Sequence, residues 1–264
     1  MNVLSEIIAK KRQRVEEAKE HFPLTEVRRA SKPHALRAAL RAEGINIIAE
    51  FKRRSPSKGV IRADADLSQI VKSYEVGGAV GISVLTEEDY FDGSLDDLRT
   101  VKSTVDLPVL RKDFVFDEYQ VHESAAAGAN AILLIVAALD DETLSRLRRV
   151  AEDELGMDAL VEVHTSEEMK RAVTSGATLI GVNNRDLRTF EVSLNTSLSL
   201  AREAPPEALL ISESGLRGPD DLRRLREAGY HGFLIGETLM RADSPEDTLR
   251  NFVGAALRGR PSLK

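Results

Sequence analysis

The sequence predicts a protein of the α/β class, a single (β/α)8 TIM barrel preceded by a helical N-terminal extension. Eight short apolar, β-branched runs follow one another at intervals that average about 26 residues, the length of one strand, one helix and two loops. Most of these runs are apolar on both alternating faces, as a parallel sheet covered by helices requires. A doubly wound open sheet is the alternative, but it usually has fewer units and a Gly-rich first turn.

The predicted strands occupy ranges that begin near Asn46 and end near Glu237. They are 46–52, 80–86, 108–114, 130–136, 158–164, 178–184, 208–214 and 231–237. The segments between them have helical periodicity, and 140–155 is the plainest example, with apolar residues three apart. Thr165 to Glu168 has the form of a capping box, and Pro219 after Gly218 is typical of a first helical residue. The helices before Gly128 and Gly229 are expected to end at those glycines.

About 45 residues precede the first strand. Leu4, Ile7, Ile8 and Val15 form one helical stripe, and 33–44 reads as a second helix that ends at Gly44. This extension could plug the bottom of the barrel, add to its surface, or cover its mouth, and the periodicity favours none of these. We expect one domain over 1–264, with 1–45 as the extension and 46–264 as the barrel.

Composition excludes several classes of protein. The chain has 264 residues, a net charge of −6 and no cysteine, so disulfides, thiolate metal sites and a cysteine nucleophile are excluded. The five histidines lack metal-ligand spacing, so we expect no metal. A pI near 5.6 argues against nucleic-acid or anionic-membrane partners. No apolar run approaches the ~18 residues of a membrane span, and the N-terminus is too charged for a signal peptide. We therefore expect a cytoplasmic protein.

Polar residues gather where the predicted strands end. Charged residues inside parallel strands are costly unless they are paired or functional. The strand ends in question carry Glu50 and Lys52, Lys112 and Asp113, Glu162 and His164, Asn183 with Asn184 and Arg185, and Glu213 with Ser214. Because barrel enzymes build their active sites at these ends, the pattern indicates a catalytic mouth. A structural ion network filling the top of the barrel is the alternative.

A phosphate-binding site is predicted by separate residues. Barrels often bind phosphate with the loops after strands seven and eight, and this chain has Ser214-Gly215 and Gly236-Glu237 there. Glycine lets backbone N–H groups approach an anion, and the Glu237 side chain should point away from it. The loop 53–59 adds hydroxyls and positive charge near the same mouth. Phe91, Phe114 and Leu133 gather there too, either as a binding surface or as a cap on the core.

Six segments along the strand ends carry a family resemblance. They are 47–57 (IIAEFKRRSPS), 110–114 (LRKDF), 160–164 (LVEVH), 182–187 (VNNRDL), 212–215 (SESG) and 234–240 (LIGETLM). In this order, and over nearly the whole chain, they resemble the indole-3-glycerol phosphate synthase family. The resemblance implies conversion of 1-(2-carboxyphenylamino)-1-deoxyribulose 5-phosphate to indole-3-glycerol phosphate, with release of CO2 and water. It implies no cofactor, a phosphorylated small-molecule substrate, and a monomer.

The resemblance also implies roles for single residues. Lys112 would be the general acid for ring closure, Lys52 would contact the substrate carboxylate and assist dehydration, and Glu162 would remove a proton in the later step. Which lysine protonates which oxygen stays open. The remaining implied sites fall into three groups. Glu50, Asn183 and Glu213 would orient the lysines and the ribulose hydroxyls; Ser55, Arg185, Ser214, Gly215, Gly236 and Glu237 would contact the phosphate and polar groups; Phe91, Phe114 and Leu133 would form a slot for the anthranilate ring.

Three other functions fit part of this pattern. A sugar-phosphate isomerase would share the phosphate loops, but such barrels use an Asp/Cys or Asp/Asp pair. A Schiff-base aldolase explains a strand lysine but not the set of Glu50, Lys52, Lys112 and Glu162. A barrel that only binds a phosphorylated ligand has no need for two lysines beside carboxylates.

Overall fold

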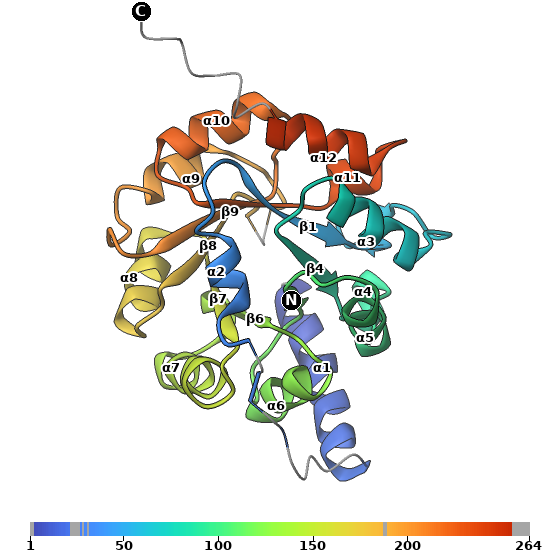
Figure 1. Cartoon of the computed structure of the whole chain (residues 1–264). Helices are drawn as coiled ribbons and strands as arrows, with labels where there is room; N and C mark the ends of the chain where they lie inside the picture. Colours follow the sequence, from blue (N-terminus) through green and yellow to red (C-terminus); the bar gives the residue numbers. More distant parts are fainter. Residues whose placement is uncertain (1–2, 22–26, 28, 31, 187–188, 255–264) are drawn as a thin grey trace, which may run out of the picture.

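The computed structural model describes residues 3–21, 27, 29–30, 32–186 and 189–254, and its eight long strands close into one barrel (Figure 1). Around the barrel the order is β1-β10-β9-β8-β7-β6-β5-β4, and every neighbouring pair is parallel. The strands are β1 Asn46–Phe51, β4 Gly81–Leu85, β5 Val109–Lys112, β6 Ala131–Ile135, β7 Asp158–Val163, β8 Leu179–Asn183, β9 Leu209–Glu213 and β10 Gly232–Ile235. Each lies inside the range expected from the sequence, so the predicted (β/α)8 barrel is confirmed.

Helices connect the strands and cover the barrel. They are α3 Leu67–Val76, α4 Glu88–Phe91, α5 Leu95–Thr104, α6 Glu118–Ala126, α7 Asp141–Arg149, α8 Ser166–Thr174, α9 Asn195–Leu200, α10 Pro219–Glu227, α11 Glu237–Met240 and α12 Pro245–Gly254. Pro219 is the first residue of α10, as predicted. Gly128 and Gly229 follow α6 and α10 with φ of 91° and 105°, which is why glycine ends both helices.

Two helical details differ from the expectation. The predicted helix 140–155 changes after α7 into a π-helical turn over Val150–Glu154. At α8, Thr165 accepts the N–H of Glu168 as a cap should, but the other half of the capping box is wrong. The Glu168 carboxylate should accept the backbone N–H of Thr165, but it accepts that of the preceding residue, His164, at 2.7 Å. The same carboxylate oxygen lies 3.0 Å from the His164 ring, which favours this position.

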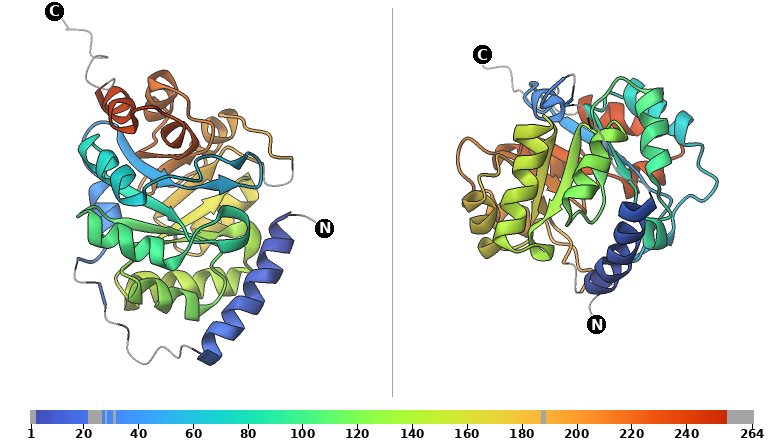
Figure 2. Two further views of the ribbon diagram at one scale, coloured as in Figure 1. Left: turned by 90° about the vertical axis from the view of Figure 1, so that its right-hand side faces the viewer. Right: turned by 90° about the horizontal axis from the view of Figure 1, so that it is seen from below.

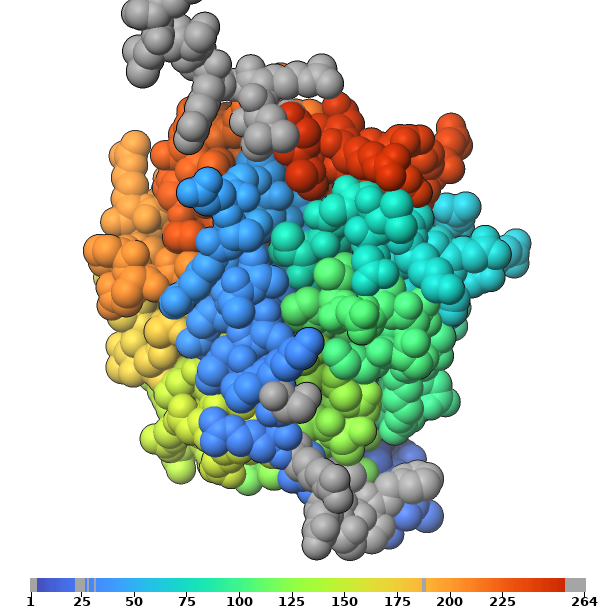
Figure 3. Space-filling view, in the orientation of Figure 1, coloured from blue at the N-terminus to red at the C-terminus, as the bar shows by residue number. Residues whose placement is uncertain are grey.

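The two helices of the extension lie on opposite sides of the barrel (Figure 2). The second helix is shorter than predicted: α2 spans Ala35–Ala39 and is followed by turns. It plugs the amino end, where Leu36 and Leu40 are buried inside the barrel. A Cβ on Gly81 or Gly232 would lie within 3 Å of these leucines, so the plug fits because two strands begin with glycine. Figure 3 shows this segment running across the amino face.

Helix α1, Val3–His21, lies at the other end of the barrel. Its Leu4 and Ile7 line the pocket at the carboxyl ends of the strands. Its Lys11 is only 4% exposed and lies 2.9 Å from carboxylate oxygens of both Glu88 and Asp113. The extension thus divides into a plug and a wall of the mouth, which were alternatives in the sequence.

The strands place a layer of polar residues above an apolar floor. Side chains two apart along a strand share a face. Ile48, Leu110, Leu160 and Leu209 pack inside the barrel with the plug. Two residues beyond the first three come Glu50, Lys112 and Glu162, and Glu213 lies four beyond Leu209. The apolar layer closes the barrel, and the polar layer lies at its carboxyl ends.

The loop after β1 contains structure that the sequence did not predict. Strands β2 (Arg54–Ser55) and β3 (Gly59–Val60) form a small antiparallel hairpin beside the mouth. Arg53, at its base, forms a bidentate ion pair with Asp97 of α5, at 2.7 and 2.9 Å. The loop is therefore tied to the barrel, and its Ser55, Ser57 and Lys58 line the pocket at the mouth, where the sequence predicted hydroxyls and positive charge.

Candidate active site

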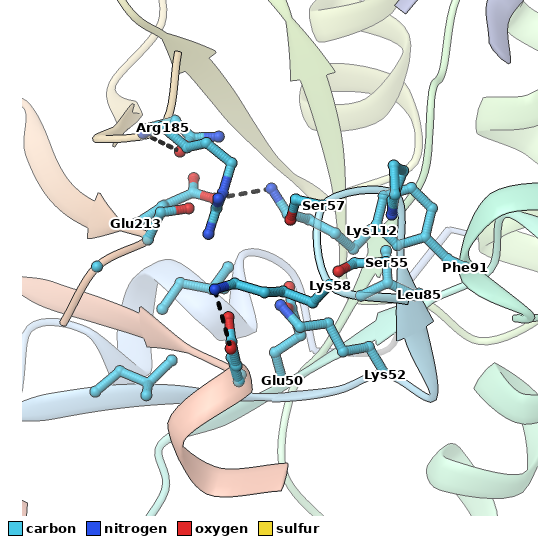
Figure 4. Close-up of a pocket in the computed structure, with 18 of the residues that line it drawn as sticks. Glu50, Lys52, Ser55, Ser57, Lys58, Leu85, Phe91, Lys112, Arg185 and Glu213 are labelled. Carbon is cyan, nitrogen blue, oxygen red and sulfur yellow. Dashed lines mark hydrogen bonds and ion pairs between the residues drawn. The ribbon is translucent and has the colours of Figure 1, made fainter. Parts of the chain in front are cut away.

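One pocket of about 490 Å3 opens at the carboxyl ends of the strands (Figure 4). The structure places on its lining all fifteen residues that the sequence singled out. They are Glu50, Lys52, Ser55, Phe91, Lys112, Phe114, Leu133, Glu162, Asn183, Arg185, Glu213, Ser214, Gly215, Gly236 and Glu237. They come from six of the eight barrel strands and from segments that follow the strands, so the barrel brings them together.

Lys112 lies between two carboxylates on the pocket floor. Its Nζ donates to Glu162 Oε2 at 2.7 Å and to Glu213 Oε2 at 2.8 Å. Both carboxylates are 2% exposed. Charge-assisted hydrogen bonds in such dry surroundings are strong, so the three side chains hold one another in place.

The pKa values of these three groups are shifted in different directions. Burial alone would lower the pKa of Lys112, but the charges of Glu162, Glu213 and Glu50 raise it well above its usual range, so the amine keeps its proton. Burial raises the pKa of Glu213 to about 7. Burial would also raise the pKa of Glu162, but Lys112 and His164 lower it, and this carboxyl is ionised.

A second lysine and carboxylate lie beside the first group. Lys52 Nζ donates to Glu50 Oε1 at 2.7 Å. Behind Glu50, the hydroxyl of Ser83 donates to Oε2 at 3.5 Å. A Cβ on Gly236 would lie 2.4 Å from Glu50 Oε1, and a Cβ on Gly181 would lie 2.2 Å from Glu213 Oε1. Both carboxylates therefore occupy space that only glycine leaves open.

One side of the pocket is apolar. The rings of Phe91 and Phe114 are 6.4 Å apart, tilted by 43°, and Leu133 on β6 lines the same pocket. Leu4 and Ile7 of α1 complete this wall. The sequence showed the stripe of α1 but gave no sign that it faces the mouth, because apolar spacing looks the same wherever a helix packs.

The opposite side carries positive charge and left-handed backbone. Ser214 and Gly215 have φ of 66° and 77°, an arrangement that costs a serine free energy and is typical of functional sites. Arg185 lines this side, and so do Ser57 and Lys58 of the loop 53–59, which was expected to add a hydroxyl and positive charge there. Arg217 and Arg241, which the sequence did not single out, line it too. The carboxylate of Glu237 accepts Arg241 Nε at 3.2 Å and lies 3.9 Å from Lys58 Nζ.

Three of the strand-end residues, and Arg54 of the loop 53–59, do not present their polar groups to the pocket. Asn184 bonds to Ser212 and to backbone below the loop, as its outward position next to Asn183 requires. Asp113 pairs with Arg111 and Lys11 in a buried ion network. His164 bonds to Glu168, and Arg54 is exposed and absent from the pocket lining. Leu187, the last residue of one motif, lies outside the described residues.

Two features are absent from the described part of the chain. No group of three or more His, Asp or Glu side chains there is arranged to hold a metal ion. No described helix is both long and apolar enough to cross a membrane.

The chain is similar to known proteins over nearly its whole length. The family model for indole-3-glycerol phosphate synthase matches residues 4–252. The indole-3-glycerol phosphate synthase of Bacteroides thetaiotaomicron is 44% identical, over 96% of this chain and 98% of the relative. That of Koribacter versatilis is 52% identical over 84% and 86%, and that of Carboxydothermus hydrogenoformans 45% over 93% and 97%.

A solved structure shows the same fold at low sequence identity. Thiamine phosphate pyrophosphorylase from Pyrococcus furiosus superposes with a TM-score of 0.61, over 81% of this chain and 96% of that chain. The two sequences are 14% identical, so the likeness concerns the barrel alone.

Proposed function

The chain belongs to the indole-3-glycerol phosphate synthase family, and we propose that the pocket at its carboxyl strand ends is where it closes the indole ring. The enzyme is a carboxy-lyase of tryptophan biosynthesis, and its phosphorylated substrate loses CO2 and water. The observation that carries the assignment of the site is the position of Lys112 between Glu162 and Glu213.

Ring closure requires a proton on the ketone oxygen as the aromatic carbon attacks the carbonyl carbon. We assign this proton to Lys112. The neighbouring carboxylates keep the amine protonated, and the oxyanion formed by the attack is a stronger base than an amine. Loss of CO2 then returns the bonding electrons to the ring, which restores its aromaticity without removal of a proton.

Dehydration requires a proton on the departing hydroxyl and a base that removes a proton from carbon. Glu162 is ionised, with its pKa lowered to about 2, so it is free to accept that proton. Lys52 is the second acid, and Glu50 orients it at 2.7 Å. Asn183, whose Oδ1 accepts the N–H of Arg185 at 3.0 Å, would orient the ribulose hydroxyls together with Glu213.

The two sides of the pocket suit the two ends of the substrate. The anthranilate ring would lie between Phe91, Phe114 and Leu133, where it loses contact with water. The phosphate would lie opposite, near Ser214, Gly215 and Gly236. Ser55 and Arg185 would complete that site, and the Glu237 carboxylate, held by Arg241, would contribute only its backbone N–H.

Conversion of the substrate, followed by indole fluorescence, tests this assignment. Lys112→Met should lower kcat by about 10²–10⁴, the range of general acid catalysis, and leave substrate affinity within a few-fold. Lys170→Met, an exposed lysine on α8, is the matched control and should retain full activity. Near-normal kcat in Lys112→Met, with a native circular dichroism spectrum, would show that Lys112 is not the acid.

We also propose that 1–264 is one domain that acts as a monomer in the cytoplasm. The large apolar side chains that are exposed in the described residues are four separate valines, at 60, 76, 173 and 192. They form no broad apolar patch of the kind that a second subunit would cover. Light scattering after size exclusion should give the mass of one chain, and calorimetry should give one cooperative transition. A dimer mass or two transitions would contradict the proposal.

A further inference from the structure

His164 is a largely buried titratable group that the proposed reaction steps do not use. It follows β7, two residues after Glu162, and its side chain is 11% exposed. Its Nδ1 lies 3.0 Å from Glu168 Oε2, and its backbone N–H donates to the same oxygen at 2.7 Å. Because a carboxylate only accepts, Nδ1 must carry hydrogen, and Glu168 fixes both the tautomer and the orientation of the ring.

The other ring nitrogen faces the proposed base. Nε2 lies 3.4 Å from Glu162 Oε1 and is buried, with no hydrogen-bond partner among the described residues. Glu162 Oε2 is bound by Lys112 at 2.7 Å. A neutral ring with hydrogen on Nδ1 would leave the lone pair of Nε2 3.4 Å from a carboxylate oxygen, which is repulsive. A cationic ring would place positive charge at that distance instead.

The charged groups around the ring favour the cation. Glu162 on its own strand, Glu168 on α8 and Glu213 on β9 all act on it. Burial would lower the pKa of His164, but the hydrogen bond to Glu168 and the charges of the three carboxylates raise it above its usual range. The ring and Lys112 thus lie within ion-pair distance of different oxygens of Glu162, at 3.4 Å from Oε1 and 2.7 Å from Oε2.

We propose that His164 is a positioning residue: as an imidazolium anchored by Glu168, it holds Glu162 Oε1, so that the carboxylate stays oriented and ionised for proton removal. This inference rests on the proposed role of Glu162 as the base of the dehydration step. Glu168 then serves two purposes, since it also binds the backbone before α8 in place of the expected capping-box contact. A purely structural role in ending β7 and starting α8 is the alternative.

Two variants separate these roles. His164→Asn keeps a donor close to the position of Nδ1, so the contact with Glu168 can persist while Nε2 is lost. Glu168→Gln keeps an acceptor oxygen for both hydrogen bonds but removes the charge that favours the imidazolium. His122→Asn, on α6, is the matched control for loss of a histidine.

Histidine NMR titration and kcat against pH are measured on the intact chain. We expect the pKa of His164 to lie above the usual ~6.5 and to fall in Glu168→Gln. The alkaline limb of kcat should move down in pH with it. His164→Asn should lower kcat at least about tenfold with KM within twofold, and His122→Asn should change neither. A His164 pKa at or below the usual value, or a limb that stays fixed while that pKa falls, would overturn the proposal.

Glu162→Gln distinguishes failure of this inference from failure of the proposed function. It should lower the pKa of His164 whether or not Glu162 is catalytic, because it removes the charge that faces Nε2. An unchanged pKa would refute the contact between the two side chains. A lowered pKa with unchanged kcat would refute the role of Glu162 as base, and with it the positioning role of His164.

Discussion

Gly181→Ala, a substitution in the barrel wall, should lower kcat although it replaces no polar residue. Gly181 is buried on β8, and its backbone lies outside the left-handed region, so alanine can adopt its conformation. The new Cβ would lie 2.2 Å from Glu213 Oε1 and 3.3 Å from Leu160 Cδ1. Ordinary contact needs about 3.4 Å, so the Glu213 carboxylate must withdraw by about 1 Å.

That withdrawal acts directly on Lys112. Its hydrogen bond to Glu213 is 2.8 Å long, and an added ångström takes it beyond hydrogen-bonding distance. A misplacement of this size in an active site can cost about 100-fold in rate, or about 2.7 kcal/mol of transition-state stabilisation. Because the Leu160 side chain needs to shift by only a few tenths of an ångström, we expect the barrel to stay folded.

The assay is product fluorescence, with kcat and KM measured for Gly181→Ala and for a matched control. Gly218→Ala suits that purpose, since no atom lies within 4 Å of the added Cβ and the backbone there is extended. The control should behave as wild type. If Gly181→Ala folds and keeps kcat within about twofold, then Glu213 has other room and its position is not set by this glycine.

Three more outcomes follow from buried charges and from the extension. Glu213 holds a proton up to about pH 7 in the fold but only to about 4.5 unfolded, so its stabilisation is present below about 4.5 and lost as pH rises through 7. The free energy of unfolding relative to Glu213→Gln should fall over that window, by at most about 1.4 kcal/mol per pH unit; a rise would refute the shift. Lys11→Met should lower the free energy of unfolding, measured in urea, by about 3 kcal/mol, near the lower end for a broken buried ion pair because Asp113 keeps its second partner, Arg111. A decrease under 1 kcal/mol would show that the Lys11–Asp113 ion pair does not stabilise the fold. Deleting 1–21 should raise KM and leave the barrel folded. Deleting 1–45 also removes Leu36 and Leu40, whose burial is worth about 1.5–3 kcal/mol each, and should unfold the barrel. If both deletions gave the same result, the extension would not be divided into a wall of the mouth and a plug.

The strands and the pocket could be predicted because both depend on short-range alternation. A parallel strand buried on both faces must be apolar throughout, so eight such runs identify eight strands. A charged residue at the carboxyl end of such a run is visible against that background, as Lys112 and Glu162 show. The same alternation explains why Asn183 faces the pocket and its neighbour Asn184 does not.

What could not be predicted depends on contacts between distant segments. The stripe of α1 and the leucines of α2 have the same kind of spacing, yet one forms a wall of the mouth and the other a plug at the amino end. His164 lies two residues after Glu162, but its ring lies between Glu162 and Glu168, and the contact with Glu168 on α8 could not be predicted from the strand alone. Gly181 reads as a weak strand residue, and only the structure shows that its missing side chain is the space for Glu213.

The distribution of charge in the pocket relates these details to the reaction. On the floor, Glu50, Glu162 and Glu213 face Lys52 and Lys112, so full ionisation of these five lining side chains would leave one excess negative charge where the substrate carboxylate must bind; the cationic His164 proposed above lies outside this lining. A proton on Glu213, whose pKa is near neutrality, removes that excess. Each turnover also takes up one proton, because a carboxylate leaves as neutral CO2. The positive and negative charges of the five floor side chains are thus equal when Glu213 is protonated. The cations on the phosphate side, such as Arg185, remain available to bind the phosphate. The net charge of the whole chain gives no hint of this division, since both signs are concentrated within one pocket.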